Sequence, residues 1–187
     1  MCLFKSAEPQ CQAYSVGLTA EEKQQILEKH NELRKKVADG LETEGSPGPQ
    51  PAAKSMPNLT WDDELSTIAQ RSANTCKFEH DKCRDVERFQ VGQNIAYSGS
   101  TEENYSPDIT TLVQMWYDEV KLFNGQDVTN FSFNPGVGHY TQLVWAKSLY
   151  LGCGAVKYNE EGFNKVYLVC NYGPAGNVIG EPMYEVR

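Results

Sequence analysis

The sequence predicts an α+β fold, because two kinds of pattern occupy different parts of the chain. Before residue 124, apolar residues recur at three- and four-residue spacing in separate segments, which is typical of amphipathic helices. Nearer the C-terminus, the runs 152–158 and 166–172 are rich in β-branched and aromatic residues and flank a turn-rich segment, which predicts an antiparallel hairpin. The length of 187 residues suits one domain. We therefore expect an N-terminal arm over 1–18 and a single domain over 19–187.

Charge and hydropathy exclude several classes of protein. The net charge is -8, the pI is near 4.9 and no cluster of Lys and Arg occurs, which argues against nucleic acid or an anionic membrane surface as a partner. No apolar run approaches the roughly 20 residues that a membrane span needs. The first residues soon turn polar, so we expect no signal peptide in this sequence.

Cysteines and glycosylation sequons indicate an extracellular protein. The six cysteines are too many for a typical cytosolic domain of this size, and they include no C-x2-C pair of the kind that binds zinc. Sequons for N-glycosylation begin at Asn58, Asn104 and Asn130. Together these features predict a secreted, disulfide-bonded protein.

The first predicted helix spans 20–39 and follows an extended arm, 1–18, that disulfides tie down. Thr19 and Glu22 have the spacing of a capping box, in which each side chain bonds the other residue's backbone amide. His30 falls within the apolar stripe of this helix. We expect it to be a buried, hydrogen-bonded histidine rather than a catalytic group.

The middle of the chain is predicted to contain one helix between irregular segments. The proline-rich segment 40–59 favours an ordered surface loop. Thr60 can cap a second helix over 61–76. The polar segment 77–96 is expected to be irregular, and 97–106 is expected to be an exposed loop.

A third helix is predicted over 107–123. Ser106 supplies an N-cap, and Pro107 is suited to the first helical position. Glu119 lies at or beside the apolar face of this helix. A carboxylate in that position must find polar partners or have its pKa raised.

The predicted hairpin carries a cysteine on each strand. Cys153 and Cys170 are equidistant from the middle of the turn at 159–164. They would face each other at a Cα separation of about 4.5–5.5 Å, which a disulfide can bridge.

The residues alone bear on three kinds of chemical site. The chain has no G-x-S-x-G motif, and six paired cysteines would leave no reactive thiol. A metal site could use His80 and His139, with Glu119 as a third ligand. No motif places these residues on one helix, so their spacing alone favours two unrelated polar histidines.

Four segments resemble the motifs of the CAP superfamily, which contains cysteine-rich secretory, antigen 5 and pathogenesis-related proteins. They occur in the family's order, and the similarity extends from about residue 18 to the C-terminus. Within the superfamily, the chain is most similar to the antigen 5 venom allergens of stinging insects, especially those of ants, at 45–51 and 83–86. The four segments are 30–34, 92–96, 138–145 and 167–177.

The resemblance implies a three-layer α-β-α sandwich with a small, mainly antiparallel sheet and a central cleft. The family's cleft contains two histidines and two acids; His80 and His139 match the histidines and Glu119 matches one acid. Gln93 occupies the other acidic position. An amide cannot act as a general base and is a poor zinc ligand. We therefore expect no required cofactor, although zinc could bind weakly at the histidine pair.

The resemblance also bears on the disulfides. Antigen 5 proteins usually have four, and this chain matches two of them: Cys11–Cys76 and Cys153–Cys170. Cys2 and Cys83 match positions whose usual partners lie outside this chain. They could pair with each other, or both could lack partners.

The resemblance implies a secreted, non-enzymatic venom allergen that binds a small hydrophobic ligand such as a lipid or sterol. The loop at 97–110, with Tyr97 and Tyr105, is the expected gripping surface. Host IgE antibodies are the expected protein partners. Two alternatives remain open: a metal-dependent hydrolase that uses the two histidines and the glutamate, and a purely structural or protein-binding role.

Overall fold

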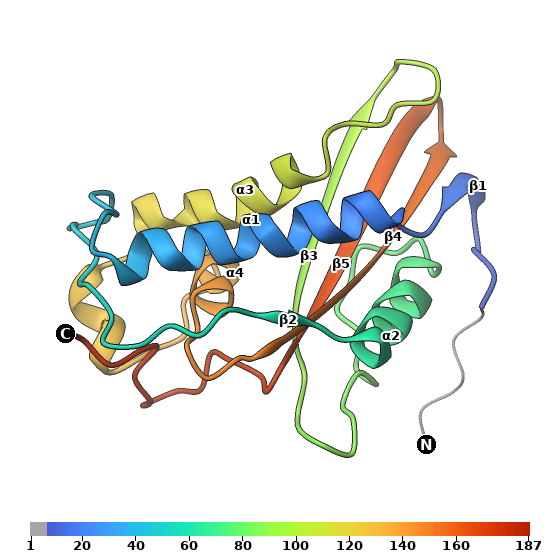
Figure 1. Ribbon diagram of the computed structural model, residues 1–187. Coiled ribbons are helices and arrows are strands. Elements are labelled where there is room, and N and C mark those ends of the chain that lie inside the picture. Colours follow the sequence, from blue (N-terminus) through green and yellow to red (C-terminus); the bar gives the residue numbers. More distant parts are fainter. Residues whose placement is uncertain (1–6) are drawn as a thin grey trace.

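A five-stranded sheet lies between helices in the computed structural model, which describes residues 7–187 (Figure 1). The strand order is β1-β4-β5-β3, and all of these neighbours are antiparallel. The short β2 pairs in parallel with the start of β4, so the sheet is mainly antiparallel, as expected. The strands are β1 (Gln12–Val16), β2 (Thr60–Trp61), β3 (Gly92–Ser100), β4 (Tyr150–Glu160) and β5 (Phe163–Gly173).

Helices cover both faces of this sheet and complete the three-layer sandwich (Figure 1). The helix α2 (Asp63–Ala73) packs on one face, against β4 and β5. Two separate apolar cores result, because alternate residues of each strand point to opposite faces. The expected α+β sandwich is thus confirmed. The helices of the other face are α1 (Ala20–Ala38), α3 (Thr110–Asp118) and α4 (Gly138–Leu143).

The predicted hairpin is confirmed as β4 and β5, which are longer than the two apolar runs. Cys153 lies opposite Cys170 and is bonded to it, with a Cα separation of 4.1 Å, slightly shorter than expected. The expected Cys11–Cys76 disulfide is also present and holds the end of the arm against the segment after α2. The arm additionally contributes β1 to the sheet. Cys2 lies outside the described residues, so its pairing with Cys83 stays a prediction.

The helix α2 lies unusually close to β4 because two glycines of β4 face it. A Cβ atom on Gly152 would lie 2.2 Å from the backbone N of Ser66, and one on Gly154 would lie 2.4 Å from the Cα of Gln70. The Gln70 amide also exchanges two hydrogen bonds with the backbone of Ala155, at 2.9 and 3.0 Å. Any side chain at these glycine positions would force α2 away from the sheet.

The first helix and the following loop agree with their predictions. The Thr19 side chain accepts a 3.0 Å hydrogen bond from the Glu22 amide, and Glu22 accepts a 2.8 Å bond from the Thr19 amide. The loop 40–59 is ordered, because its buried Glu42 accepts a 2.5 Å hydrogen bond from the Tyr117 hydroxyl and pairs with Lys36 at 2.8 Å.

The second and third helices are shorter than predicted. The helix α2 begins at Asp63 with Asp62 as its N-cap, not with Thr60, because Thr60 and Trp61 pair with β4 as β2. The third helix begins at Thr110 rather than at residue 107. The Asp108 side chain accepts a hydrogen bond from the Thr110 amide, the first of the helix. The helix ends at Asp118 and continues as the 3₁₀ turns η1 (Glu119–Leu122) and η2 (Gly125–Thr129).

The prediction for 77–106 is wrong where β3 lies. This strand crosses the expected boundary between an irregular segment and an exposed loop, and pairs with β5 over nine residues, 92–100. Its glycine, serine and amide residues hide the strand pattern in the sequence. Pairing with β5 holds this segment as the edge strand of the sheet. It also places Gln93 and Asn94 beside β5, which comes much later in the sequence.

Arg34 joins α1 to two distant segments inside the molecule. Its guanidinium is buried and donates five hydrogen bonds to backbone carbonyls, at 2.7–3.2 Å. Burial lowers its pKa to about 10, which still leaves it protonated at neutral pH. The four accepting carbonyls belong to Pro57, Leu143, Trp145 and Ser148.

Replacing Arg34 with methionine is expected to lower the free energy of unfolding by at least about 3 kcal/mol, since several buried carbonyls would lose their donors. Urea denaturation measures this loss. Lys35→Met is the matched control, because Lys35 is exposed on the same helix, and its effect should stay within about 0.5 kcal/mol. Equal losses in the two variants would contradict a special role for Arg34.

Candidate functional site

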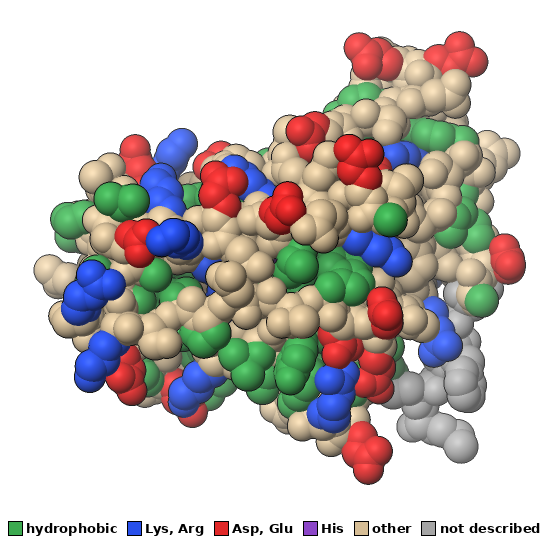
Figure 2. Space-filling view, in the orientation of Figure 1, with side chains coloured by type: hydrophobic (Ala, Val, Ile, Leu, Met, Phe, Trp, Pro, Cys, Tyr) green, Lys and Arg blue, Asp and Glu red, His purple; other side chains and the backbone are tan. Residues whose placement is uncertain are grey.

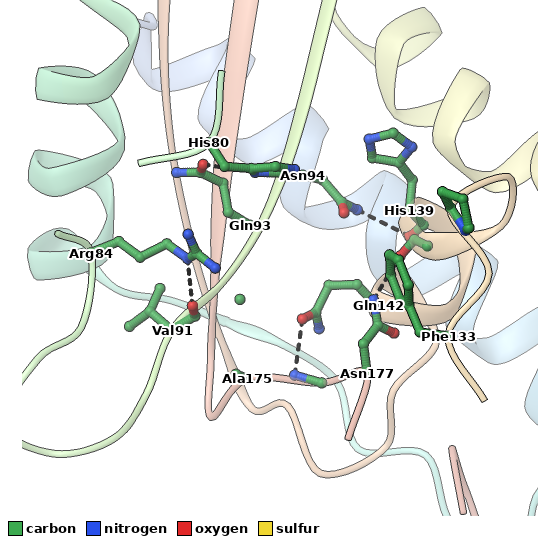
Figure 3. A pocket seen from close by; sticks show the side chains of 14 residues that line it. His80, Arg84, Val91, Gln93, Asn94, Phe133, His139, Gln142, Ala175 and Asn177 are labelled. Atoms are coloured by element: carbon green, nitrogen blue, oxygen red, sulfur yellow. Dashed lines mark hydrogen bonds between the residues drawn. The ribbon is translucent and has the colours of Figure 1, made fainter. Parts of the chain in front are cut away.

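A cleft of about 430 Å³ opens at the free edge of β3, the last strand in the sheet order (Figure 3). Its walls come from the segment after α2, the start of β3, the loop before α4, the helix α4 and the segment after β5. Both candidate histidines line this cleft, so the structure brings together residues far apart in sequence. The polar lining residues are His80, Arg84, Gln93, Asn94, His139, Gln142 and Asn177.

His80 is oriented by the Gln93 side chain. The Gln93 Oε1 atom lies 3.0 Å from His80 Nδ1 and 2.9 Å from the Asp81 backbone N. Since the Asp81 amide can only donate, Gln93 presents its oxygen, and the neutral His80 ring carries its proton on Nδ1. The Gln93 Nε2 atom donates to Asn171 at 2.9 Å, which agrees with this assignment. The Nε2 atom of His80 is therefore unprotonated.

The protonation of His80 follows from its surroundings. Burial lowers the pKa of its imidazole, and the nearby charges of Arg84 and His139 lower it further, while the hydrogen bond to Gln93 opposes the shift. The ring is therefore neutral at pH 7, the form in which a histidine binds metal.

His139 is oriented by Glu119 in a comparable way. The Glu119 Oε1 atom lies 2.6 Å from His139 Nδ1. The Glu119 Oε2 atom accepts hydrogen bonds from the backbone amides of His139 and Tyr140, at 2.9 and 3.1 Å. The carboxylate thus binds the first amides of α4, which have no partner within the helix. Trp116 stacks on the His139 ring with centroids 6.2 Å apart. These contacts leave Nε2 as the ring nitrogen available to the cleft.

Glu119 lies behind His139 and is not among the residues that line the cleft. Both of its oxygens are occupied by His139 and by α4. Within residues 7–187, no three His, Cys, Asp or Glu side chains are close enough together to hold a metal ion. Glu119 is therefore not placed as a third ligand, and a metal site at the two imidazoles, His80 and His139, stays a prediction.

A buried polar chain connects α1 to the backbone of His139. Asn94 donates to the His139 carbonyl at 3.0 Å and to the Tyr172 hydroxyl at 3.2 Å. The hydroxyl lies 2.7 Å from His30 Nε2, and His30 Nδ1 lies 2.8 Å from the Ile26 carbonyl. Because the carbonyl can only accept, His30 carries its proton on Nδ1. His30 is fully buried, so the prediction of a structural histidine is confirmed.

The sequence motifs did not identify several of the residues that line the cleft, although these residues lie within or beside the segments that resemble the CAP motifs. Gln142 accepts the Gly176 amide at 2.9 Å, and Asn177 donates to the Gly138 carbonyl at 3.0 Å. A Cβ atom on Gly92 would lie 2.0 Å from Gln142 Oε1, so a side chain there would displace the Gln142 amide from its bond to Gly176. The motifs carried a signal for these positions, but only the tertiary contacts assign them a role.

The other predicted site residues lie away from the cleft. Tyr97 faces the α2 side of the sheet and contacts Phe78, with ring centroids 4.9 Å apart. Tyr105 packs against the core of the opposite face. The two tyrosines therefore do not form one gripping surface. The three sequon asparagines, Asn58, Asn104 and Asn130, are all exposed.

A family model described as "CAP: Cysteine-rich secretory protein family" matches residues 27–172, the range that holds both histidines and their two orienting side chains. The chain belongs to the CAP family. Among CAP relatives, it is 53% identical to Venom allergen 3 of Solenopsis invicta, over all of this chain and 83% of the relative. It is 51% identical to Venom allergen 5 of Vespula maculifrons, over all of this chain and 92% of the relative.

Solved structures agree with this assignment. NaASP2, solved with Zn2+, superposes with a TM-score of 0.79 and 33% identity over 95% of this chain and 90% of its own. BmVAL-1 gives a TM-score of 0.75 and 27% identity over 97% and 88%. This CAP protein is thus a secreted, disulfide-bonded protein of the antigen 5 type, and it is similar to the venom allergens of ants and wasps.

The charge distribution on the surface and the character of the helices agree with the composition of the chain. Figure 2 shows acidic and basic side chains interspersed over the face that carries α1, with no basic patch on the face drawn. Among residues 7–187, no helix has the length and apolar character to cross a membrane.

His30 is expected to make the stability of this CAP protein fall as the pH drops. Burial lowers its folded-state pKa from 6.5 to about 4, so below pH 6.5 the unfolded chain binds more protons than the folded one. The loss begins near pH 6.5 and reaches about 2–3 kcal/mol near pH 4.5.

Urea denaturation across this pH range measures the effect. His30→Gln is the comparison, since glutamine can bond the same two partners without titrating. Carboxylates contribute equally to both proteins, so the difference between the two curves isolates His30. Parallel curves would refute this account.

Proposed function

We propose that this secreted CAP protein is a non-enzymatic binding protein whose cleft takes a divalent cation through the Nε2 atoms of His80 and His139. The observation that carries the proposal is the matching orientation of the two rings. Each Nδ1 bonds an oxygen, from Gln93 in one case and Glu119 in the other, and each Nε2 is left available. Histidines that bind metals are commonly held in this way by an oxygen behind the ring.

The similarity to NaASP2 supports zinc as the cation, because that protein was solved with Zn2+. Zinc binds imidazole nitrogen readily and usually has four ligands. This cleft offers two nitrogens and no carboxylate in its lining. Water or an external ligand would supply the remaining positions, so we expect binding weaker than at a site with carboxylate ligands.

Once a cation occupies both imidazoles, the cleft favours binding over hydrolysis because no free base remains in its lining. A hydrolase must activate water with a group that accepts a proton. The Gln93 amide cannot do this, and Glu119 is occupied by His139 and two backbone amides. Recognition by host IgE antibodies is proposed on the similarity to the venom allergens.

Zinc titration by calorimetry tests the cation site. Replacing either His80 or His139 with alanine should weaken binding at least about tenfold, since half of the protein ligands would be lost. Gln93→Glu should strengthen it, because a carboxylate would replace the neutral amide. Glu185→Gln removes a surface carboxylate outside the cleft and should leave the affinity unchanged.

Peptidase and esterase assays on the zinc-loaded protein separate binding from catalysis. We expect turnover indistinguishable from that of His80→Ala. Turnover that disappears in His80→Ala would establish the hydrolase instead. Zinc affinity that is unaffected by both alanine variants would refute the site.

A small hydrophobic ligand is the second candidate function. It is favoured by a pocket of about 500 Å³ near the C-terminus, separate from the cleft. Organic extraction followed by lipid mass spectrometry, with binding of added fatty acid or sterol, tests it. Absence of bound lipid and of added-ligand binding would refute it. The apolar lining residues are Pro57, Ala146, Leu149, Pro182, Met183 and Tyr184.

A further inference from the structure

We propose that the same cleft binds an oxyanion, the carboxylate or phosphate group of a ligand, with Arg84 as its principal anchor. The inference deepens the proposed function and rests on it only in treating the cleft as a binding site. It names the chemical class of ligand that would share the cleft with the histidines.

The charges of the lining support an anion. No Asp or Glu is among the residues that line the cleft, although the whole chain has a net charge of -8. The lining contains one guanidinium, two imidazoles and four side-chain amides (Figure 3). A guanidinium donates hydrogen bonds to carboxylate and phosphate oxygens, whereas the four amide nitrogens already donate to protein groups. A cleft of this composition is suited to an anion even before any metal binds.

Arg84 is held in place by the backbone. Its Nε donates to the Val91 carbonyl at 2.6 Å (Figure 3), and its Nη1 donates to the Asp81 carbonyl at 2.5 Å. A guanidinium has five N–H donors in a fixed plane, so two bonds set its direction and three donors remain. Because its position is already fixed, it would lose little side-chain entropy when an anion binds.

The nearest carboxylates of the same loop do not line the cleft. Asp81 accepts the Cys83 amide at 2.8 Å, and Asp85 accepts the Val91 amide at 2.9 Å. Both side chains instead stabilise the loop that carries Arg84. The charge of Arg84 at the cleft is therefore not met by a carboxylate in the cleft wall.

The rim suggests the rest of the ligand. Phe133 is 57% exposed and forms the cleft wall with Pro135 and Ala175. An anion with a small apolar part would place its charged group at Arg84 and its apolar part against this wall. If a cation binds the two imidazoles, the same anion could also occupy one of its open coordination positions.

The test uses metal-free, full-length protein titrated with inorganic phosphate or with acetate, followed by NMR shifts of backbone and arginine Nε–H signals. Saturable shifts at the cleft are expected with at least one of the two anions, and their relative strengths show which group is preferred. Arg84→Gln should weaken binding at least about tenfold, the loss expected for a charge-assisted hydrogen bond. Arg187→Gln makes the same change of charge at the exposed C-terminus and should leave binding unchanged.

A second variant keeps the test decisive if Arg84→Gln unfolds the loop. Gln93→Glu places a carboxylate in the cleft, so it should weaken anion binding while it strengthens zinc binding. Absence of saturable binding, or binding unaffected by both variants, would overturn the anion site. If the unmodified protein binds the anion but does not bind zinc, only the cation site is overturned. The two proposals can therefore fail separately.

Discussion

The site depends on a clamp that holds α4 at both ends with charged groups, the half-buried Glu119 and the buried Arg34. This helix has only six residues, Gly138–Leu143, which is too short to be stable by itself. Glu119 binds its first amides, and Arg34 donates to the Leu143 carbonyl at its end. One anion thus meets the positive end of the helix and one cation the negative end, as the helix dipole favours. The position of His139 follows from these two contacts.

The two halves of the cleft use the same geometry with different charge. On one side Gln93 orients His80, and on the other Glu119 orients His139. The amide preserves the hydrogen bond that an acid would make, but it supplies neither a negative charge nor a base. Together with Arg84, the Gln93 amide leaves the lining without a carboxylate, which is the basis for proposing ligand binding rather than catalysis.

Local patterns predicted the elements whose stability is local. The capping box placed the start of α1 correctly, and the symmetric spacing of Cys153 and Cys170 gave the register of the hairpin. The prediction failed at β3, and the helix α4 was not predicted. The strand β3 has few β-branched residues and owes its conformation to pairing with β5, while α4 contains residues typical of strands and owes its conformation to the clamp.

The sequence by itself determined the family, the sandwich fold, the disulfide of the hairpin and the two histidines that line the cleft. Each of these rests on motifs or on spacing along a short stretch of chain. Only the tertiary structure decided that Glu119 stands behind His139, that Arg84 lines the cleft and that no carboxylate does. The physical reason is that side-chain direction depends on contacts between distant segments. Gln93 and Asn171, for example, meet only because β3 and β5 pair.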